Sequence, residues 1–99
     1  MSYSDLYAAD LRGSILVILD AADCETSLAV LRASLARATP HDPPMNRLRT
    51  EVSWLAQRGL VDQRKIDGVV EGVHIAERGR DVARGRERVG GVAPPESDG

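Results

Sequence analysis

The residues of this chain best suited to chemistry lie between positions 46 and 57. If Leu48, Val52 and Leu55 mark the buried stripe of a helix, a turn of about 100° per residue places polar side chains opposite them. The polar set is Asn46, Arg47, Thr50, Ser53 and Gln57, with Trp54 among them and Arg49 and Arg58 on the flanks. Such amide, hydroxyl and guanidinium groups bind base edges and phosphate oxygens in a DNA groove. An ordinary solvated helix face carries similar residues, so the pattern alone leaves both interpretations open.

Two further cations, Arg64 and Lys65, lie just before an Asp67-Gly68 pair. Two β-rich segments flank this pair, and Asp-Gly favours the two-residue turn of a β-hairpin. Point charges near a hairpin tip bind phosphates without distinguishing sequences. Three acidic side chains in the same segments reduce that attraction, so an ordinary solvated hairpin is the alternative interpretation.

Two helices are expected before this region. Ser2 or Ser4 can cap the first, which has a broad apolar face. Gly13 interrupts that helix at a cost of up to about 1 kcal/mol relative to alanine. Thr26 or Ser27 can cap the second helix, which ends before a proline-rich connection.

The ends of the third helix are marked by proline and glycine. Three prolines in residues 40–44 prevent regular structure in the connection that precedes it. Asp42 is one predicted cap, with a proline at the first helical position. A later start would put Pro44 at the capping position. Gly59 can adopt the left-handed conformation that ends a helix, and the hairpin follows it directly.

The chain after the hairpin divides into a basic helix and a tail. Residues 77–89 predict a fourth helix with five arginines, weakened by Gly79 and Gly85. Residues 90–99 contain prolines and glycines but no periodic apolar pattern, so we expect a disordered tail after a domain of residues 1–89. Removing residues 91–99 should then change the free energy of unfolding by less than about 0.5 kcal/mol.

The stretch from Leu48 to Val61, L-R-T-E-V-S-W-L-A-Q-R-G-L-V, resembles the second half of a winged helix-turn-helix domain of the ArsR/MarR-like class. The turn A-E-R-G at residues 76–79 matches a T-E-K/R-G-like turn after the wing, with Ala76 where Thr is usual. More narrowly, the chain to about Val92 is similar to small ArsR-like proteins of Mu-like phages and prophages. Pro44 departs from that family, which usually has a capping Ser there.

This resemblance implies an α+β fold, a winged helix-turn-helix with three core helices, a β-hairpin wing and a C-terminal helix. It implies sequence-specific binding of double-stranded DNA by a small phage or prophage transcriptional regulator. The expected DNA-binding residues are Asn46, Arg47, Arg49, Thr50, Ser53, Gln57, Arg64 and Lys65. The alternative is a winged helix used as a protein–protein adaptor in a phage replication, packaging or assembly complex.

The distribution of charge bears on these two functions. The net charge of −2 argues weakly against a nucleic-acid partner. Residues 47–88, however, hold ten basic and seven acidic side chains, whereas residues 1–46 hold three basic and six acidic ones. The excess of positive charge therefore coincides with the expected recognition helix and hairpin, as a phosphate-binding face requires.

Other residue types suggest little further chemistry. Cys24, His41 and His74 lack metal-ligand spacing, so we expect no metal, a small buried cysteine and two surface histidines. We find no nucleophile elbow or phosphate-binding glycine loop, and we expect no enzyme, cofactor or small-molecule ligand. Trp54 points away from the buried stripe. We expect the hairpin to cover it, with a dimer interface as the second interpretation and base stacking as the third.

Assembly and location complete the expectations. Duplex-binding proteins of this size commonly pair to cover two half-sites, so we expect a homodimer. Its interface would use the first and fourth helices, with apolar contacts from Leu6, Tyr7, Leu11, Val82 and Val89. The chain has neither a membrane-spanning apolar run nor a signal peptide pattern, which predicts no membrane association and a cytoplasmic location. The resemblance to phage proteins implies that this is the cytoplasm of a bacterial host.

Overall fold

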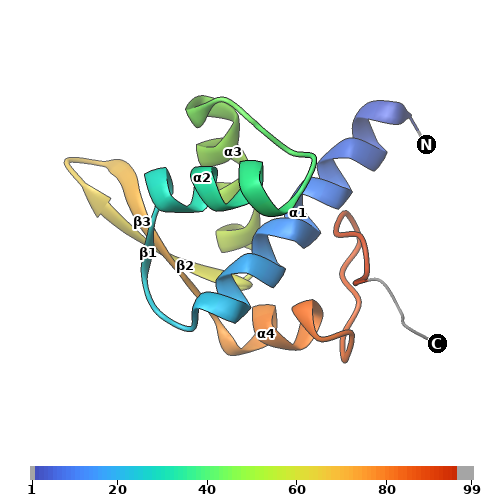
Figure 1. Cartoon of the computed structure of the whole chain (residues 1–99). Helices are drawn as coiled ribbons and strands as arrows, with labels where there is room; N and C mark the ends of the chain where they lie inside the picture. The colour runs from blue at the N-terminus through green and yellow to red at the C-terminus, as the bar shows by residue number, and fades with distance from the viewer. Residues whose placement is uncertain (1, 96–99) are drawn as a thin grey trace.

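The described part of the chain, residues 2–95 of a computed structural model, contains four helices and a three-stranded antiparallel sheet (Figure 1). The elements are α1 (Tyr3–Ala22), β1 (Thr26–Ser27), α2 (Leu28–Ala38), α3 (Met45–Gln57), β2 (Val61–Ile66), β3 (Val69–Ile75) and α4 (Glu77–Ala83). The strands are arranged in the order β1-β3-β2. The α+β fold class predicted from the sequence is confirmed at this level.

Helix α1 begins at a capping box. The Ser2 hydroxyl accepts a hydrogen bond from the Asp5 amide at 3.2 Å, and the Asp5 carboxylate accepts one from the Ser2 amide at 3.3 Å. Gly13 does not interrupt this helix of 20 residues. The carbonyl oxygen of Ala93 lies 2.8 Å from the position that a Cβ at Gly13 would occupy. Glycine at this position therefore permits the close approach of a distant segment.

The start of α2 is joined to the sheet. Ser27 caps the helix, since its hydroxyl accepts a hydrogen bond from the Val30 amide at 3.1 Å. Thr26 and Ser27 also form the short strand β1, in which Thr26 lies opposite Val73 of β3. The sequence did not predict this strand because two residues are too few to show an alternating pattern.

Helix α3 has the later of the two predicted starts. Pro44 occupies the capping position, where its side chain offers no hydrogen bond to the exposed amides. At the other end Gly59 has a positive φ of 74°, and the Leu60 amide donates to the Leu55 carbonyl at 3.1 Å. Gly59 therefore ends the helix as the sequence predicted and turns the chain directly into β2.

Strands β2 and β3 form the predicted hairpin. Asp67 and Gly68 both have positive φ angles, 51° and 78°, which fit the tight turn that Asp-Gly favours. The register places Arg64 opposite Gly72 but Lys65 opposite Val70, so that β3 contains one extra residue between these pairs. This irregularity lies between the base of the hairpin and its tip, and bulges of this kind bend a strand.

The hydrophobic core surrounds α1. In Figure 1 this helix runs between α2 and α3 on one side and α4 on the other, and it contacts all three. The core side chains include Leu11, Ile15, Leu16, Leu19, Leu28, Leu31, Leu35, Leu48, Val52, Leu55, Leu60, Val73 and Val82. The stripe of α3 predicted from the sequence is thus buried as expected. No helix among the described residues has the length and apolar character that crossing a membrane requires.

Helix α4 is shorter than predicted. It ends at Ala83 instead of continuing to residue 89, because Gly85 adopts a positive φ of 78°. The Arg86 amide then donates to the Asp81 carbonyl at 2.8 Å, which reverses the chain. Of the two glycines in this segment, Gly85 thus ends the helix, whereas Gly79 lies within it.

Residues 90–95, which we call the C-terminal segment, lie against α1, although the sequence led us to expect a disordered tail from residue 90. The Ala93 amide donates to the Ala9 carbonyl at 3.0 Å, and an Arg12 side-chain N–H donates to the Gly91 carbonyl at 3.0 Å. Val92 is half-buried against the core. Residues 96–99 of the expected tail lie outside the described residues.

Candidate nucleic-acid interface

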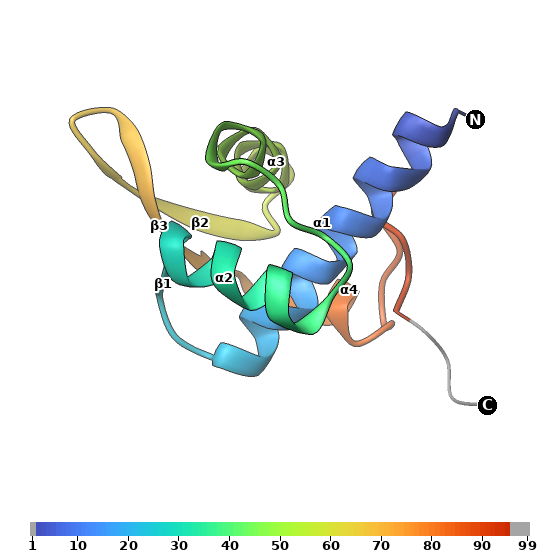
Figure 2. The same ribbon diagram turned by 45° about the horizontal axis from the view of Figure 1, so that its top comes forward.

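The outward face of α3 carries a continuous row of neutral polar side chains. Asn46, Thr50 and Gln57 are exposed and Ser53 is half-buried. Their spacing of four, three and four residues places them along one side of the helix. Figure 2 looks almost along the axis of α3 and shows the β2–β3 hairpin beside it on one flank and the first half of α1 on the other. The four residues are called the neutral row below.

The arginines of α3 point toward its two flanks. On the α1 side, Arg47 Nε donates to a Glu51 carboxylate oxygen at 2.8 Å, and its guanidinium lies 5.5 Å from the centre of the Tyr7 ring. On the hairpin side, Arg49 Nε donates to the Val70 carbonyl at 3.3 Å. An Arg49 Nη also lies 3.7 Å from a Glu71 carboxylate oxygen. Both arginines of α3 that were predicted to bind DNA therefore have intramolecular partners.

Glu51 is a buried charge that the sequence analysis missed. It is 2% exposed, and its two carboxylate oxygens accept hydrogen bonds from Arg12 Nε at 2.9 Å and Arg47 Nε at 2.8 Å. A buried carboxylate is tolerated only when it is paired in this way. The burial of Glu51 could have been inferred from the sequence, because Glu51 lies three residues after Leu48 and four before Leu55, within the buried stripe.

Trp54 lies between two guanidinium groups, so the expectation that the hairpin covers it is wrong. Arg12 is 3.9 Å from the ring centre and Arg58 is 3.5 Å from it. The ring edge faces Gly91, where an added Cβ would lie 2.7 Å from a ring carbon. Cation–π contacts and the C-terminal segment therefore cover this tryptophan. A surface depression beside it is lined by Arg49, Thr50, Ser53, Trp54 and Gln57.

The hairpin cations differ from each other. Arg64 Nε donates to a carboxylate oxygen of Glu25, the residue before β1, at 2.8 Å. Lys65 is exposed and has no acidic partner among residues 2–95. The tip beyond it exposes two apolar side chains, with Ile66 53% and Val69 43% accessible. Of this pair, only Lys65 lacks an acidic partner among the described residues.

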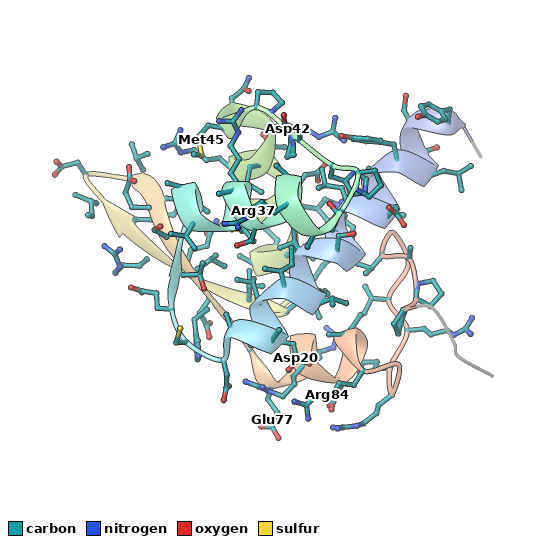
Figure 3. All side chains as sticks on the ribbon, in the orientation of Figure 1. Asp20, Arg37, Asp42, Met45, Glu77 and Arg84 are labelled. Carbon is teal, nitrogen blue, oxygen red and sulfur yellow. The ribbon has the colours of Figure 1, made fainter. Side chains whose placement is uncertain are left out.

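The arginines of α4 and the following loop are also paired with acids. Arg80 contacts Asp20 at 2.9 Å and Asp23 at 2.7 Å, and the hydrogen bond that it donates to Asp23 raises the pKa of the Arg80 guanidinium above its ordinary value. Arg84 also contacts Asp20 at 3.1 Å, and Figure 3 shows these two side chains together between the end of α1 and α4. The positive excess of residues 47–88 is thus partly neutralised by acids from the first quarter of the chain.

One histidine and the cysteine differ from the sequence-based expectation in their exposure. His41, in the connection between α2 and α3, is 4% exposed instead of lying at the surface, because its ring packs against α1. Its Nε2 lies 2.6 Å from an Asp10 carboxylate oxygen, and its ring meets the edge of Tyr7 with centroids 5.0 Å apart. Cys24 is exposed instead of buried, and His74 is exposed as expected. Residues 2–95 contain no cluster of three or more potential metal ligands.

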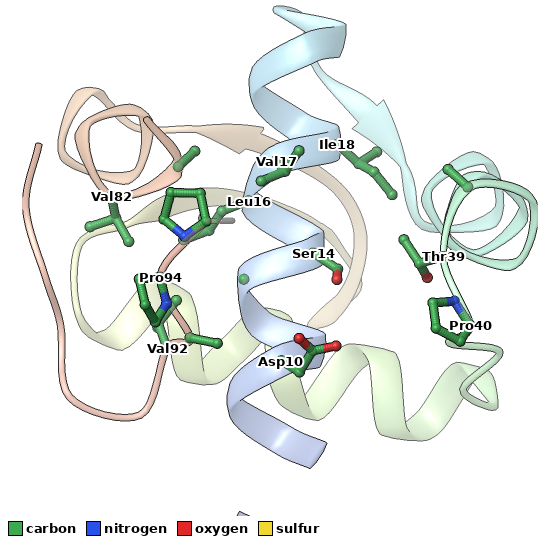
Figure 4. A pocket seen from close by; sticks show the side chains of 15 residues that line it. Asp10, Ser14, Leu16, Val17, Ile18, Thr39, Pro40, Val82, Val92 and Pro94 are labelled. Carbon is green, nitrogen blue, oxygen red and sulfur yellow. The ribbon is translucent and has the colours of Figure 1, made fainter. Parts of the chain in front are cut away.

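A groove of about 600 Å³ runs along the solvent side of α1 (Figure 4). Its walls are the end of α2 with Thr39 and Pro40 on one side, and Val82 of α4 with Val92 and Pro94 on the other. Asp10 is the one charged residue of its lining. The lining provides neither a nucleophile with a nearby base nor a set of phosphate-binding groups.

Two residues expected at a dimer interface belong to the core of the single chain. Leu11 is fully buried and Val82 is 3% exposed, because α1 and α4 pack directly on each other. Leu6 is 55% exposed and remains accessible on the first turns of α1.

These features define a small α+β protein in which a well-packed helix and an adjoining hairpin present one polar surface. No family model matches the chain, and no solved structure gives a significant match. The chain is 34% identical over 92 residues to the uncharacterised protein gp26 of Escherichia phage Mu, a match covering 93% of this chain and 94% of gp26. The chain therefore belongs to the family of this phage Mu protein, and the relationship supports a phage origin.

Proposed function

We propose that this protein is a winged helix-turn-helix protein that binds double-stranded DNA through α3 and the β2–β3 hairpin. It would act as a small phage-type transcriptional regulator. The observation that carries the proposal is the neutral row of α3, which lies on a solvent-facing helix beside a projecting hairpin. In this proposal α2 and α3 form the helix-turn-helix, α3 is the recognition helix and the hairpin is the wing.

The dimensions of α3 support groove binding. Its 13 residues span about 20 Å, and a helix with its side chains fits the major groove, which is about 12 Å wide. Its inner stripe is fixed in the core, so the outer row has a defined orientation. A helix bound in the groove would bring the neighbouring hairpin close to the flanking backbone.

Three cations remain suited to phosphate contacts. Lys65 is unpaired among the described residues, and the side chains of Arg47 and Arg49 keep 40% and 37% of their surface exposed. A half-exposed guanidinium that donates through Nε retains further N–H groups for a phosphate oxygen. These residues lie on both flanks of the neutral row, as contacts to the two sides of a groove require.

A protein–protein adaptor is the second candidate function, and the hairpin tip favours it. Ile66 and Val69 expose apolar surface next to Asp67, a composition that suits a protein partner better than a phosphate backbone. The internal ion pairs of Arg47, Arg49 and Arg64 also favour the adaptor function, because they reduce the charge available for DNA.

A DNA-binding titration at two salt concentrations separates these functions. Three phosphate contacts predict a slope of about −2.7 in a plot of log K against log salt, hence about a fortyfold loss of affinity between about 50 and 200 mM salt. Arg37→Ala is the matched control, because Arg37 is exposed on α2 and lies outside the proposed surface. If the wild-type protein binds no duplex even at the lower salt concentration, the adaptor function replaces this proposal.

The proposal includes a homodimer that covers two half-sites. Tyr3, Leu6 and Val17 are exposed along one side of α1, where a second copy of the chain could cover them. Sedimentation at micromolar concentration tests this part separately. A single species near the chain mass of 10.7 kDa would show that the protein is a monomer.

A further inference from the structure

We infer that the neutral row of α3 (Asn46, Thr50, Ser53 and Gln57) selects A·T base pairs, while Arg47 and Arg49 hold the phosphates on either side of the groove. The inference rests on the proposed DNA-binding function and names the kind of sequence that this surface would prefer. It differs from the usual expectation for an arginine-rich recognition helix, in which arginine binds guanine.

The intramolecular contacts of the arginines turn their side chains away from the centre of the face. Glu51 draws Arg47 toward α1 at 2.8 Å, whereas the Val70 carbonyl draws Arg49 toward β3 at 3.3 Å. The Glu51 carboxylate is itself buried and shared with Arg12, so it forms a fixed anchor for Arg47. A guanine contact needs a guanidinium directed at the base edge. These two groups point instead to the sides, where the phosphates of a groove would lie.

Arg58, which follows the last residue of α3, also has intramolecular partners. Its guanidinium stacks 3.5 Å from the centre of the Trp54 ring, and one Nη donates to the Trp54 carbonyl at 3.1 Å. These two contacts hold the Arg58 guanidinium against Trp54 at the C-terminal end of the helix. The middle of the outward face is therefore free of cations.

The neutral row has unused hydrogen-bonding groups at both of its ends. Gln57 is exposed, and its amide has no hydrogen-bond partner among residues 2–95. The side-chain oxygen Oδ1 of Asn46 accepts a hydrogen bond from the Arg47 amide at 2.9 Å, which leaves the side-chain NH₂ group of Asn46 free. The row covers 11 residue steps, hence about 16 Å of helix, and a bound duplex would meet these two amides at different base pairs.

The two central residues of the row are partly engaged. The Thr50 hydroxyl donates to the main-chain carbonyl of Asn46 at 3.0 Å, so its hydrogen is no longer available to a base. The methyl group of this exposed residue can still contact a thymine methyl. Ser53 Oγ accepts a hydrogen bond from Gln63 at 2.9 Å. Thr50 therefore favours an apolar contact, and Ser53 joins α3 to strand β2.

The chemistry of these groups favours A·T pairs. A free glutamine amide matches the N6 donor and N7 acceptor of adenine, and a threonine methyl matches the thymine methyl. The Asn46 NH₂ can donate to a major-groove acceptor of either kind of base pair, so the discrimination comes from Gln57 and Thr50. No carboxylate of the row is available to accept from cytosine, and no guanidinium points outward to favour guanine.

Selection from a pool of random duplexes tests the inference. We expect the wild-type protein to enrich sites with A·T pairs at the contacted positions. Gln57→Ala should lose the preference at one pair, with about a tenfold loss of affinity for the enriched site and little loss for others. Arg47→Ala should weaken binding to all duplexes alike, because it contacts phosphate. The control, Arg37→Ala, should select the same sites as the wild type.

Two outcomes overturn the inference while the proposed function stands. One is enrichment of a G·C pair whose preference disappears in Arg47→Ala or Arg49→Ala, and the other is duplex binding without any sequence preference. Absence of binding to every duplex overturns the proposed function as well, which distinguishes that failure from the first two. Thermal unfolding of each variant, followed by circular dichroism, shows whether a loss of binding arises from a loss of folding.

Discussion

Helix α3 and the β2–β3 hairpin form the two halves of the proposed DNA-binding surface, but they are supported very differently. Leu48, Val52 and Leu55 fix the helix in the core, and Glu51 ties it to α1. The hairpin, in contrast, has only exposed residues from position 64 to position 69. A segment with few buried contacts opens and bends at low cost in free energy. The helix can therefore set a fixed register on DNA, whereas the hairpin tip can adjust to the backbone.

The same two regions also differ in whether their basic side chains have intramolecular partners. The flanking arginines of α3 are held by Glu51 and by the hairpin strand β3, whereas Lys65 near the hairpin tip has no acidic partner among the described residues. Neutral groups on a rigid helix favour discrimination between bases, and an exposed, unpaired lysine favours attraction that is independent of sequence. This division leads to the predictions below, given from the largest expected effect to the smallest.

The largest effect is expected where the helix is anchored. Arg12→Ala removes the hydrogen bond to buried Glu51, the stacking on Trp54 and the hydrogen bond to Gly91. We expect a loss of about 3 kcal/mol in the free energy of unfolding, because Glu51 is left buried with one partner. Urea unfolding followed by circular dichroism measures this loss. A change below about 0.5 kcal/mol, similar to that expected for an exposed arginine, would show that α3 is not anchored in this way.

A smaller effect is expected when residues 91–99 are removed. Truncation eliminates the hydrogen bonds of Gly91 and Ala93 to Arg12 and Ala9 and exposes the half-buried Val92 surface. Each lost hydrogen bond contributes about 1 kcal/mol, so we expect a loss of about 1–2 kcal/mol, not the negligible change suggested by the sequence alone.

The truncated chain also has a spectroscopic readout. Trp54 is the only tryptophan of the protein, and its ring edge faces Gly91. Its fluorescence emission should shift to longer wavelength once the C-terminal segment is removed, because the ring edge then contacts water. Unchanged emission together with an unchanged melting temperature would mean that the segment does not cover this residue in solution.

The smallest effect on stability is expected at the hairpin. Lys65→Ala removes an exposed side chain without a hydrogen bond or ion pair among residues 2–95, so the free energy of unfolding should change by less than about 0.5 kcal/mol. The slope of log K against log salt for DNA binding should fall by about one unit. Arg64→Ala should change the slope less, because Glu25 already neutralises Arg64 at 2.8 Å. Equal slopes for Lys65→Ala and the wild type would show that Lys65 makes no phosphate contact and would contradict the proposed role of the hairpin.

The elements of the fold could be predicted where their signals are local. The Asp67-Gly68 turn, the end of α3 at Gly59 and the capping role of Ser27 all depend on residues within a few positions of each other. Such signals act through backbone conformation and nearby hydrogen bonds, which a single sequence records directly. Residues 77–89 were predicted less well, because either glycine there could have ended the helix and only the structure identified Gly85.

The contacts that hold the candidate site together were harder to predict because they join distant residues. Glu51 and Arg12 are 39 positions apart, and a glutamate within an apolar stripe gives no indication of its partner. Gly13 looked like a weak point in α1, whereas it permits the approach of Ala93. Only the three-dimensional arrangement connects such pairs, and it also decides which arginines have their charge neutralised.

Mapping of amide chemical shifts by NMR during titration of the ¹⁵N-labelled protein with a duplex tests the central claim most directly. The claim is that α3 and the hairpin together bind DNA. It predicts that the shifts are largest at residues 44–57 and 62–70 and that those of the α1 face around Val17 are small. Shifts concentrated on the α1 groove and the C-terminal segment, or no shifts at low salt, would contradict it.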